Sequence, residues 1–133
     1  MRRTFEQLIR RDVSILKEKG IKIPDIIVEE GDISEFPKNR DFAMSIYNGE
    51  NEPVIFRYSP RLLDQSIGII QGISRHEFGH IWFFGQGDVT NHTEIQADKK
   101  AEEMFGTPIF YNKDYIQTIY PNKYSIRPHH LPK

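Results

Sequence analysis

The sequence contains no cysteine among its 133 residues, which excludes both disulfide bonds and thiolate metal ligands. A metal ion held by side chains would therefore need histidine, aspartate or glutamate. Neither sign of charge dominates, because the formal net charge is −1. We therefore expect no strong attraction to nucleic acid or to an anionic membrane. At this length the chain can fold as one domain around an apolar core.

Long apolar segments are missing as well. The most apolar stretch, residues 67–84, is interrupted by Gln71, Arg75, Glu77 and two histidines, and is too polar for a membrane span. Arginines stand near the N-terminus without an apolar segment behind them, so we expect no signal peptide. The expected protein is cytoplasmic, does not span a membrane and does not bind nucleic acid.

Apolar residues at helical spacing predict an N-terminal helix in the first twenty positions. Thr4 and Gln7 have the spacing of a capping box at its start, and Gly20 stands where a helix would stop. The apolar residues within 21–28 favour a β-strand after it.

Two further β-strands are predicted at residues 42–46 and 54–58. Asn48 and Gly49 between them form a strong turn signal, which indicates that the two strands pair antiparallel. Together with the first strand they predict a small, mainly antiparallel sheet.

Two more helices are expected after these strands. Ser59 before a proline favours a long helix that starts there or at Asp64 and ends by Gly85, and Asn91 or Thr93 could cap a shorter helix after it. The predicted fold class is thus α+β. Residues 1–110 would form the domain, and residues 111–133 would form a C-terminal tail.

The most informative residues are His76, Glu77 and His80. On a helix, residues four apart lie on the same face, so both imidazoles can bind one metal ion. Glu77 is rotated by about 100° from His76, so it flanks the ion without binding it. This position suits a general base that takes a proton from a water molecule on zinc. The alternative is a pair of structural histidines in the core.

A third ligand is sought downstream, since catalytic zinc usually has three protein ligands and one open position. Glu94 follows His80 by 14 residues, which is enough chain to turn and begin a neighbouring helix. Asp98, one turn after Glu94, could accept a hydrogen bond from the far nitrogen of a ligand histidine. His92 competes with Glu94 as the third ligand, because imidazole binds zinc equally well.

The segment HEFGH at residues 76–80, followed by EIQAD at residues 94–98, resembles the gluzincin pattern of zinc peptidases. Its Glu-x-x-Ala-Asp form is similar to the catalytic domains of CAAX-prenyl-type membrane peptidases and of ImmA/IrrE-like peptidases. In its length the chain looks closest to the soluble minigluzincins. The resemblance implies a minimal zincin-like domain. It also implies the site roles: His76, His80 and Glu94 as zinc ligands, Glu77 as general base and Asp98 behind a ligand.

The expected function is a zinc-dependent endopeptidase that cleaves a peptide or protein substrate bound in extended form. Residues 54–58 are the predicted strand edge for that substrate, and Tyr58, Tyr111, Tyr115 or His92 could stabilise the oxyanion. The tail at 111–133 is either a solvated terminus or a segment that keeps the peptidase latent. The rival function is a zinc-binding regulatory or interaction protein on the same scaffold, with little general proteolysis.

Overall fold

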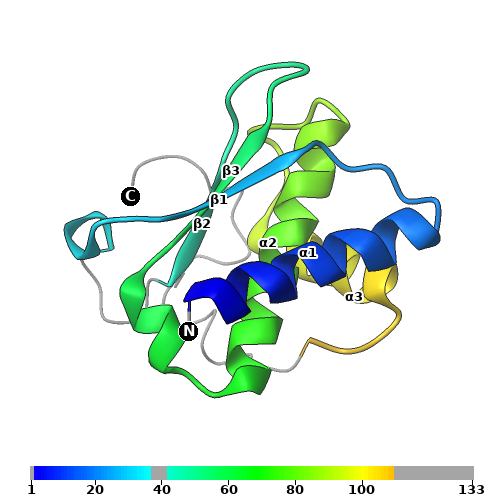
Figure 1. Ribbon diagram of the computed structural model, residues 1–133. Coiled ribbons are helices and arrows are strands. Elements are labelled where there is room, and N and C mark those ends of the chain that lie inside the picture. Colours follow the sequence, from blue (N-terminus) through cyan, green and yellow to red (C-terminus); the bar gives the residue numbers. More distant parts are fainter. Residues whose placement is uncertain (1, 37–41, 110–133) are drawn as a thin grey trace.

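The computed structural model describes residues 2–36 and 42–109, which form a small α+β domain (Figure 1). Its described part contains three α-helices, α1 (Arg2–Glu18), α2 (Ile67–Gly85) and α3 (Glu94–Phe105), and three strands, β1 (Ile26–Glu30), β2 (Ala43–Ile46) and β3 (Val54–Tyr58). Two 3₁₀ helices, η1 (Ile33–Glu35) and η2 (Pro60–Asp64), connect them. The predicted α+β class is confirmed, whereas the predicted tail at 111–133 lies outside the described residues.

The sheet has the strand order β1-β3-β2. The predicted antiparallel pairing of β2 with β3 is confirmed, but β1 pairs with β3 in parallel, so the sheet is mixed rather than mainly antiparallel. The strand β3 takes the central position because Val54, Phe56 and Tyr58, at most 4% exposed, point into the core. Since β3 is paired on both sides, the prediction that residues 54–58 offer an edge to a substrate is wrong.

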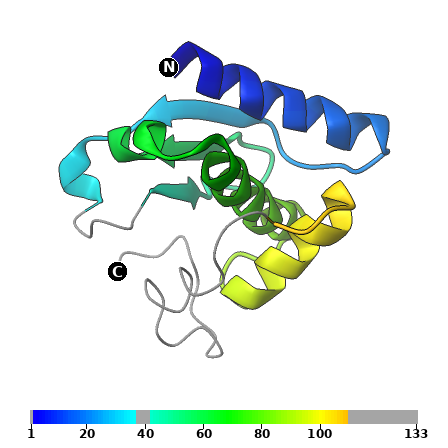
Figure 2. The same cartoon turned by 90° about the horizontal axis from the view of Figure 1, so that it is seen from below.

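Phe56 of β3 shows how the helices cover the sheet. Its ring centroid lies 5.9 Å from that of Phe5 on α1 and 6.4 Å from that of Phe78 on α2. Since one side chain points to one face, α1 and α2 cover the same face of the sheet. In Figure 2, α3 lies beside α2. The core between these layers holds α2 in place, and α2 carries the histidine motif.

Some helix boundaries differ from the sequence predictions. The helix α1 already begins at Arg2, so Thr4 lies inside it and forms no capping box at its start. The segment from Ser59 onward is not one helix, because the extended backbone of Gln65 separates η2 from α2. Ser66 then caps α2 anew. Within the described part of the chain, no helix combines the length and the apolar character needed to cross a membrane.

A buried ion pair joins the three helices. Asp12 on α1 is 1% exposed and accepts hydrogen bonds from Nη2 and Nε of Arg75 on α2, at 3.1 and 3.3 Å. The guanidinium of Arg75 also lies 4.3 Å from the ring centre of Phe105 at the end of α3. Burial raises the pKa of Asp12, although Arg75 works in the opposite direction. The pair therefore connects the helices, and the removal of both charged groups from water offsets part of its attraction.

We expect Asp12→Ala to lower the free energy of unfolding by about 3 kcal/mol, because it leaves the mostly buried Arg75 without its carboxylate. Urea denaturation of the two single variants and of Asp12→Ala/Arg75→Met measures this loss and the coupling between the residues. The double variant should recover part of the stability, since it removes the uncompensated charge. A loss below about 0.5 kcal/mol in Asp12→Ala would contradict the role assigned to the pair.

Candidate metal centre

The helix α2 presents His76, Glu77 and His80 inside the protein, where they are 5%, 2% and 0% exposed. The helix starts at Ser66, whose Oγ accepts a hydrogen bond from the backbone N–H of Ile69. From there it runs uninterrupted through the motif to Gly85, so the two histidines lie one turn apart on the same face. Both the helix and the four-residue spacing agree with the sequence prediction.

The helix α3 begins at Glu94, and its start is fixed by a capping box. Oγ of Thr93 accepts a hydrogen bond from the backbone N–H of Gln96 at 3.1 Å, and Oε1 of Gln96 accepts one from the N–H of Thr93 at 2.8 Å. Of the two predicted caps, the structure therefore uses Thr93 and not Asn91. This start places Glu94 in the first turn, 3% exposed.

The glycine inside the histidine motif allows α3 to approach α2 closely. A Cβ atom at Gly79 would lie 1.9 Å from the carbonyl oxygen of Ala97 and 2.7 Å from its carbonyl carbon. Both atoms belong to the backbone, so only glycine fits at this position. Because Ala97 lies one turn after Glu94, this contact brings the carboxylate of Glu94 to the face of α2 that carries the histidines.

The side chains of His76, His80 and Glu94 converge. Nε2 of His76 lies 2.9 Å from Oε1 of Glu94, Nε2 of His80 lies 3.2 Å from the same oxygen, and the two Nε2 atoms lie 3.2 Å apart. Zinc bonds of 2.0–2.1 Å at tetrahedral angles would separate neighbouring donor atoms by about 3.3 Å. Among the described residues, these three buried side chains form a group that could hold a metal ion.

The outer nitrogens of the two histidines face further polar groups. Nδ1 of His76 lies 3.5 Å from Oδ1 of Asp98, and Nδ1 of His80 lies 2.7 Å from Nε2 of His92. A neutral histidine that donates from Nδ1 carries a lone pair on Nε2. When both histidines are neutral and donate from Nδ1 to these partners, two imidazole lone pairs and one carboxylate oxygen point at one another. Such an arrangement is repulsive unless a positive charge lies between them.

The pKa of His76 reflects the same demand for positive charge. Burial lowers it, but hydrogen bonds with Asp98 and Glu94 and the negative charges of Glu94 and Glu77 outweigh burial and raise the pKa to about 10. The negative groups around His76 therefore favour a positive charge at this centre.

The carboxylate of Glu77 is held by a residue that the sequence analysis missed. Ser45 on β2, 0% exposed, donates a hydrogen bond from Oγ to Oε1 of Glu77 at 2.7 Å. The larger apolar residues Phe42, Met44 and Ile46 alternate with Ala43 and Ser45 and belong to the other face of this strand. The small buried residues between them, Ala43 and Ser45, are the signal that β2 lies close to another element.

His92, the other predicted candidate for the third ligand, lies behind His80 rather than in the converging group. It is 1% exposed, and burial lowers its pKa against the opposing effect of Asp88. Among the oxyanion candidates, Tyr58 packs in the core with its ring centroid 4.6 Å from that of Phe5. Tyr111 and Tyr115 lie outside the described residues.

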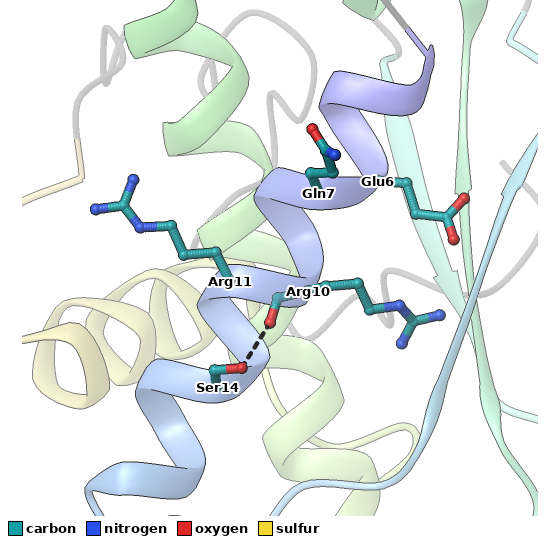
Figure 3. Close-up of a pocket in the computed structure, with 5 residues that line it drawn as sticks. All are labelled: Glu6, Gln7, Arg10, Arg11 and Ser14. Atoms are coloured by element: carbon teal, nitrogen blue, oxygen red, sulfur yellow. Dashed lines mark hydrogen bonds between the residues drawn. The ribbon is translucent and has the colours of Figure 1, made fainter.

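A shallow pocket elsewhere on the surface is lined by side chains of α1 (Figure 3). Arg10 and Arg11 extend away from each other there, and Oγ of Ser14 donates a hydrogen bond to the backbone oxygen of Arg10 at 3.2 Å. Since these side chains come from the exposed face of one helix and do not converge, they offer no multi-point contact to a ligand. The remaining residues that line it are Glu6 and Gln7.

No protein-family model, no curated protein and no solved structure matches this chain.

Proposed function

We propose that this protein is a zinc-dependent metallopeptidase with His76, His80 and Glu94 as zinc ligands. The observation that carries the proposal is the convergence of two imidazole nitrogens and one carboxylate oxygen, 2.9–3.2 Å apart, in a buried centre. Nitrogen and oxygen donors at this spacing suit Zn²⁺, and a set of three leaves the fourth position open, as in catalytic zinc sites.

Glu77 is the proposed general base and acid. A zinc ion at the centre would lower the pKa of a water molecule to about 7 and polarise a peptide carbonyl. The carboxylate of Glu77 would accept the proton of the attacking water and deliver it to the leaving amine. Two features support this role. Ser45 orients the carboxylate of Glu77, and the negative charge of that carboxylate contributes to the raised pKa of the neighbouring His76.

The strand β2 is the proposed place for an extended substrate. It stands at the end of the strand order, and Ser45 connects it directly to Glu77 on α2. A peptide that pairs with a sheet edge gains main-chain hydrogen bonds without requiring particular side chains. Pairing with β2 would bring the peptide chain alongside the proposed base, which pairing with the central strand β3 could not do.

The central test is Glu77→Gln. The amide keeps the shape of the side chain but cannot accept the proton, so cleavage of an unfolded protein substrate should fall by about 10²–10⁴-fold. Zinc content, measured by elemental analysis of the same samples, should remain at the wild-type level. A chelator should abolish wild-type cleavage, and added zinc should restore it.

This test also separates the peptidase from the rival function. A wild-type protein that binds zinc but cleaves no substrate would favour a zinc-binding regulatory or interaction protein. A wild-type protein without bound zinc would refute the metal centre itself. Equal cleavage by wild type and Glu77→Gln would remove Glu77 from the mechanism.

Ser45→Ala should have a smaller effect on the same reaction. It removes the hydrogen bond that orients Glu77 but leaves the carboxylate in place, so we expect kcat to fall by about tenfold with zinc affinity unchanged. Ser45→Thr, which retains the hydroxyl, serves as the partial rescue. If the alanine variant lost zinc instead of rate, Ser45 would act on the metal centre and not on the base.

A further inference from the structure

His92 packs between aromatic side chains behind the proposed metal centre. Its ring stacks on Phe83, with centroids 4.5 Å apart and an interplanar angle of 9°, and the ring of Phe84 meets it at 64°. Nε2 of His92 lies 2.7 Å from Nδ1 of His80. The stacking partners thus hold the imidazole with one nitrogen aimed at the outer nitrogen of a proposed ligand.

Asp88, on the far side of His92 from His80, determines which ring nitrogens of the two histidines carry a proton. Nδ1 of His92 is buried, and Oδ1 of Asp88 lies 3.6 Å from it, slightly beyond a normal hydrogen bond. A carboxylate on that side favours the proton on Nδ1 of His92, which leaves Nε2 as an acceptor. His80 then donates its Nδ1–H to His92, and its own Nε2 carries the lone pair directed at Glu94 and His76.

We propose that His92 is a positioning residue, which fixes the tautomer and the ring orientation of His80 so that Nε2 of His80 can bind the metal. Asp88 orients His92 in turn from its partly exposed position. This inference rests on the proposed metal centre and adds a role that the paired-histidine motif does not contain. Groups behind a ligand histidine increase its basicity, and their loss typically weakens metal affinity 10–100-fold.

The two outer contacts differ in chemistry. Behind His76 stands the carboxylate of Asp98, whereas behind His80 stands an imidazole, and the carboxylate of Asp88 lies one ring further away. Because Oδ1 of Asp88 also accepts a hydrogen bond from the backbone N–H of Asn91 at 2.9 Å, the loop before α3 holds Asp88 in place. Asp88→Asn retains that acceptor and removes only the charge.

The test compares zinc affinity, measured by competition with a chromophoric chelator, in wild type, His92→Phe, His92→Gln and Asp88→Asn. Phenylalanine keeps the stacking on Phe83 but accepts no hydrogen bond, so affinity should fall about 10–100-fold. Glutamine offers an amide oxygen to His80 and should restore most of the affinity. Asp88→Asn should lie between the wild type and His92→Phe.

Two spectroscopic readouts separate positioning from ligation and from general packing. The Co²⁺ absorption spectrum should keep the wild-type coordination number in His92→Phe, because His92 is not a ligand. In zinc-loaded wild type, ¹⁵N NMR should show a protonated Nδ1 on His80 and an unprotonated Nε2 on His92. This measurement needs no variant, so the proposal stays testable even if His92→Phe fails to fold.

Unchanged zinc affinity in His92→Phe would overturn the proposal, as would equal losses in His92→Phe and His92→Gln. Loss of one Co²⁺ ligand in His92→Phe would make His92 a ligand instead. All these readouts concern metal binding alone. A protein that binds zinc as described but cleaves no peptide would therefore refute the proposed peptidase and leave the role of His92 intact, whereas a wild type without zinc refutes both.

Discussion

Glu94→Gln is expected to reduce bound zinc from about one ion per chain to below a tenth, through a loss of affinity of at least about 10³-fold. Glutamine has nearly the same shape, but its neutral amide oxygen is a poor zinc ligand. The variant would also leave the two histidine ligands without the carboxylate that lies 2.9 and 3.2 Å from their Nε2 atoms. Elemental analysis and chelator competition measure the loss.

Thermal unfolding gives an independent measurement of the same loss. Zinc at 100 times its dissociation constant should stabilise the wild type by about 2.7 kcal/mol, and this shift should disappear in Glu94→Gln. The matched control is Glu103→Gln on the same helix, since the side chain of Glu103 is 73% exposed and pairs with Lys100 at the surface. Its zinc affinity should equal that of the wild type.

The outcome also decides between Glu94 and His92 as the third ligand. Glu94→Gln should weaken zinc binding far more than any variant of His92. If Glu94→Gln retained stoichiometric zinc while His92→Phe released it, the assignment of the third ligand would be wrong.

Among the glycine-to-alanine substitutions in the described part of the chain, Gly79→Ala is expected to destabilise the protein most. The new Cβ would meet the backbone of Ala97 at 1.9 Å, so α3 must move away from α2 by about 1 Å or more. Overpacking of this kind costs about 3 kcal/mol, which corresponds to a melting temperature lower by roughly 10 °C. Zinc affinity should fall more than about 100-fold, because Glu94 moves with α3.

Gly68→Ala provides the matched control on the same helix. A Cβ at Gly68 meets no atom within 4 Å, and its φ is not positive. Alanine there should leave zinc binding unchanged and stabilise the protein by up to about 0.5–1 kcal/mol through helix propensity. A Gly79→Ala protein with wild-type stability and zinc content would show that the contact with Ala97 does not position Glu94.

Local patterns predicted most of the secondary structure correctly. The apolar spacing in α1, the turn between β2 and β3 and the threonine that caps α3 are each set by interactions within a few residues. The central position of β3 and its parallel pairing with β1 were missed, because strand order depends on which apolar faces meet across the whole domain. The proposed edge for a substrate therefore changes from residues 54–58 to β2.

The site divides in the same way. Helical geometry alone places His76 and His80 one turn apart with Glu77 beside them, so the sequence by itself determined the paired histidines and the proposed base. The packing of separate elements decided the rest: Glu94 joins the histidines through the contact of Gly79 with Ala97, while Ser45 holds Glu77 and His92 lies behind His80. The physical reason is the distance along the chain over which each interaction acts. Periodicity along one helix is a local property, whereas the approach of a second helix or a strand depends on side chains that meet only after the chain has folded.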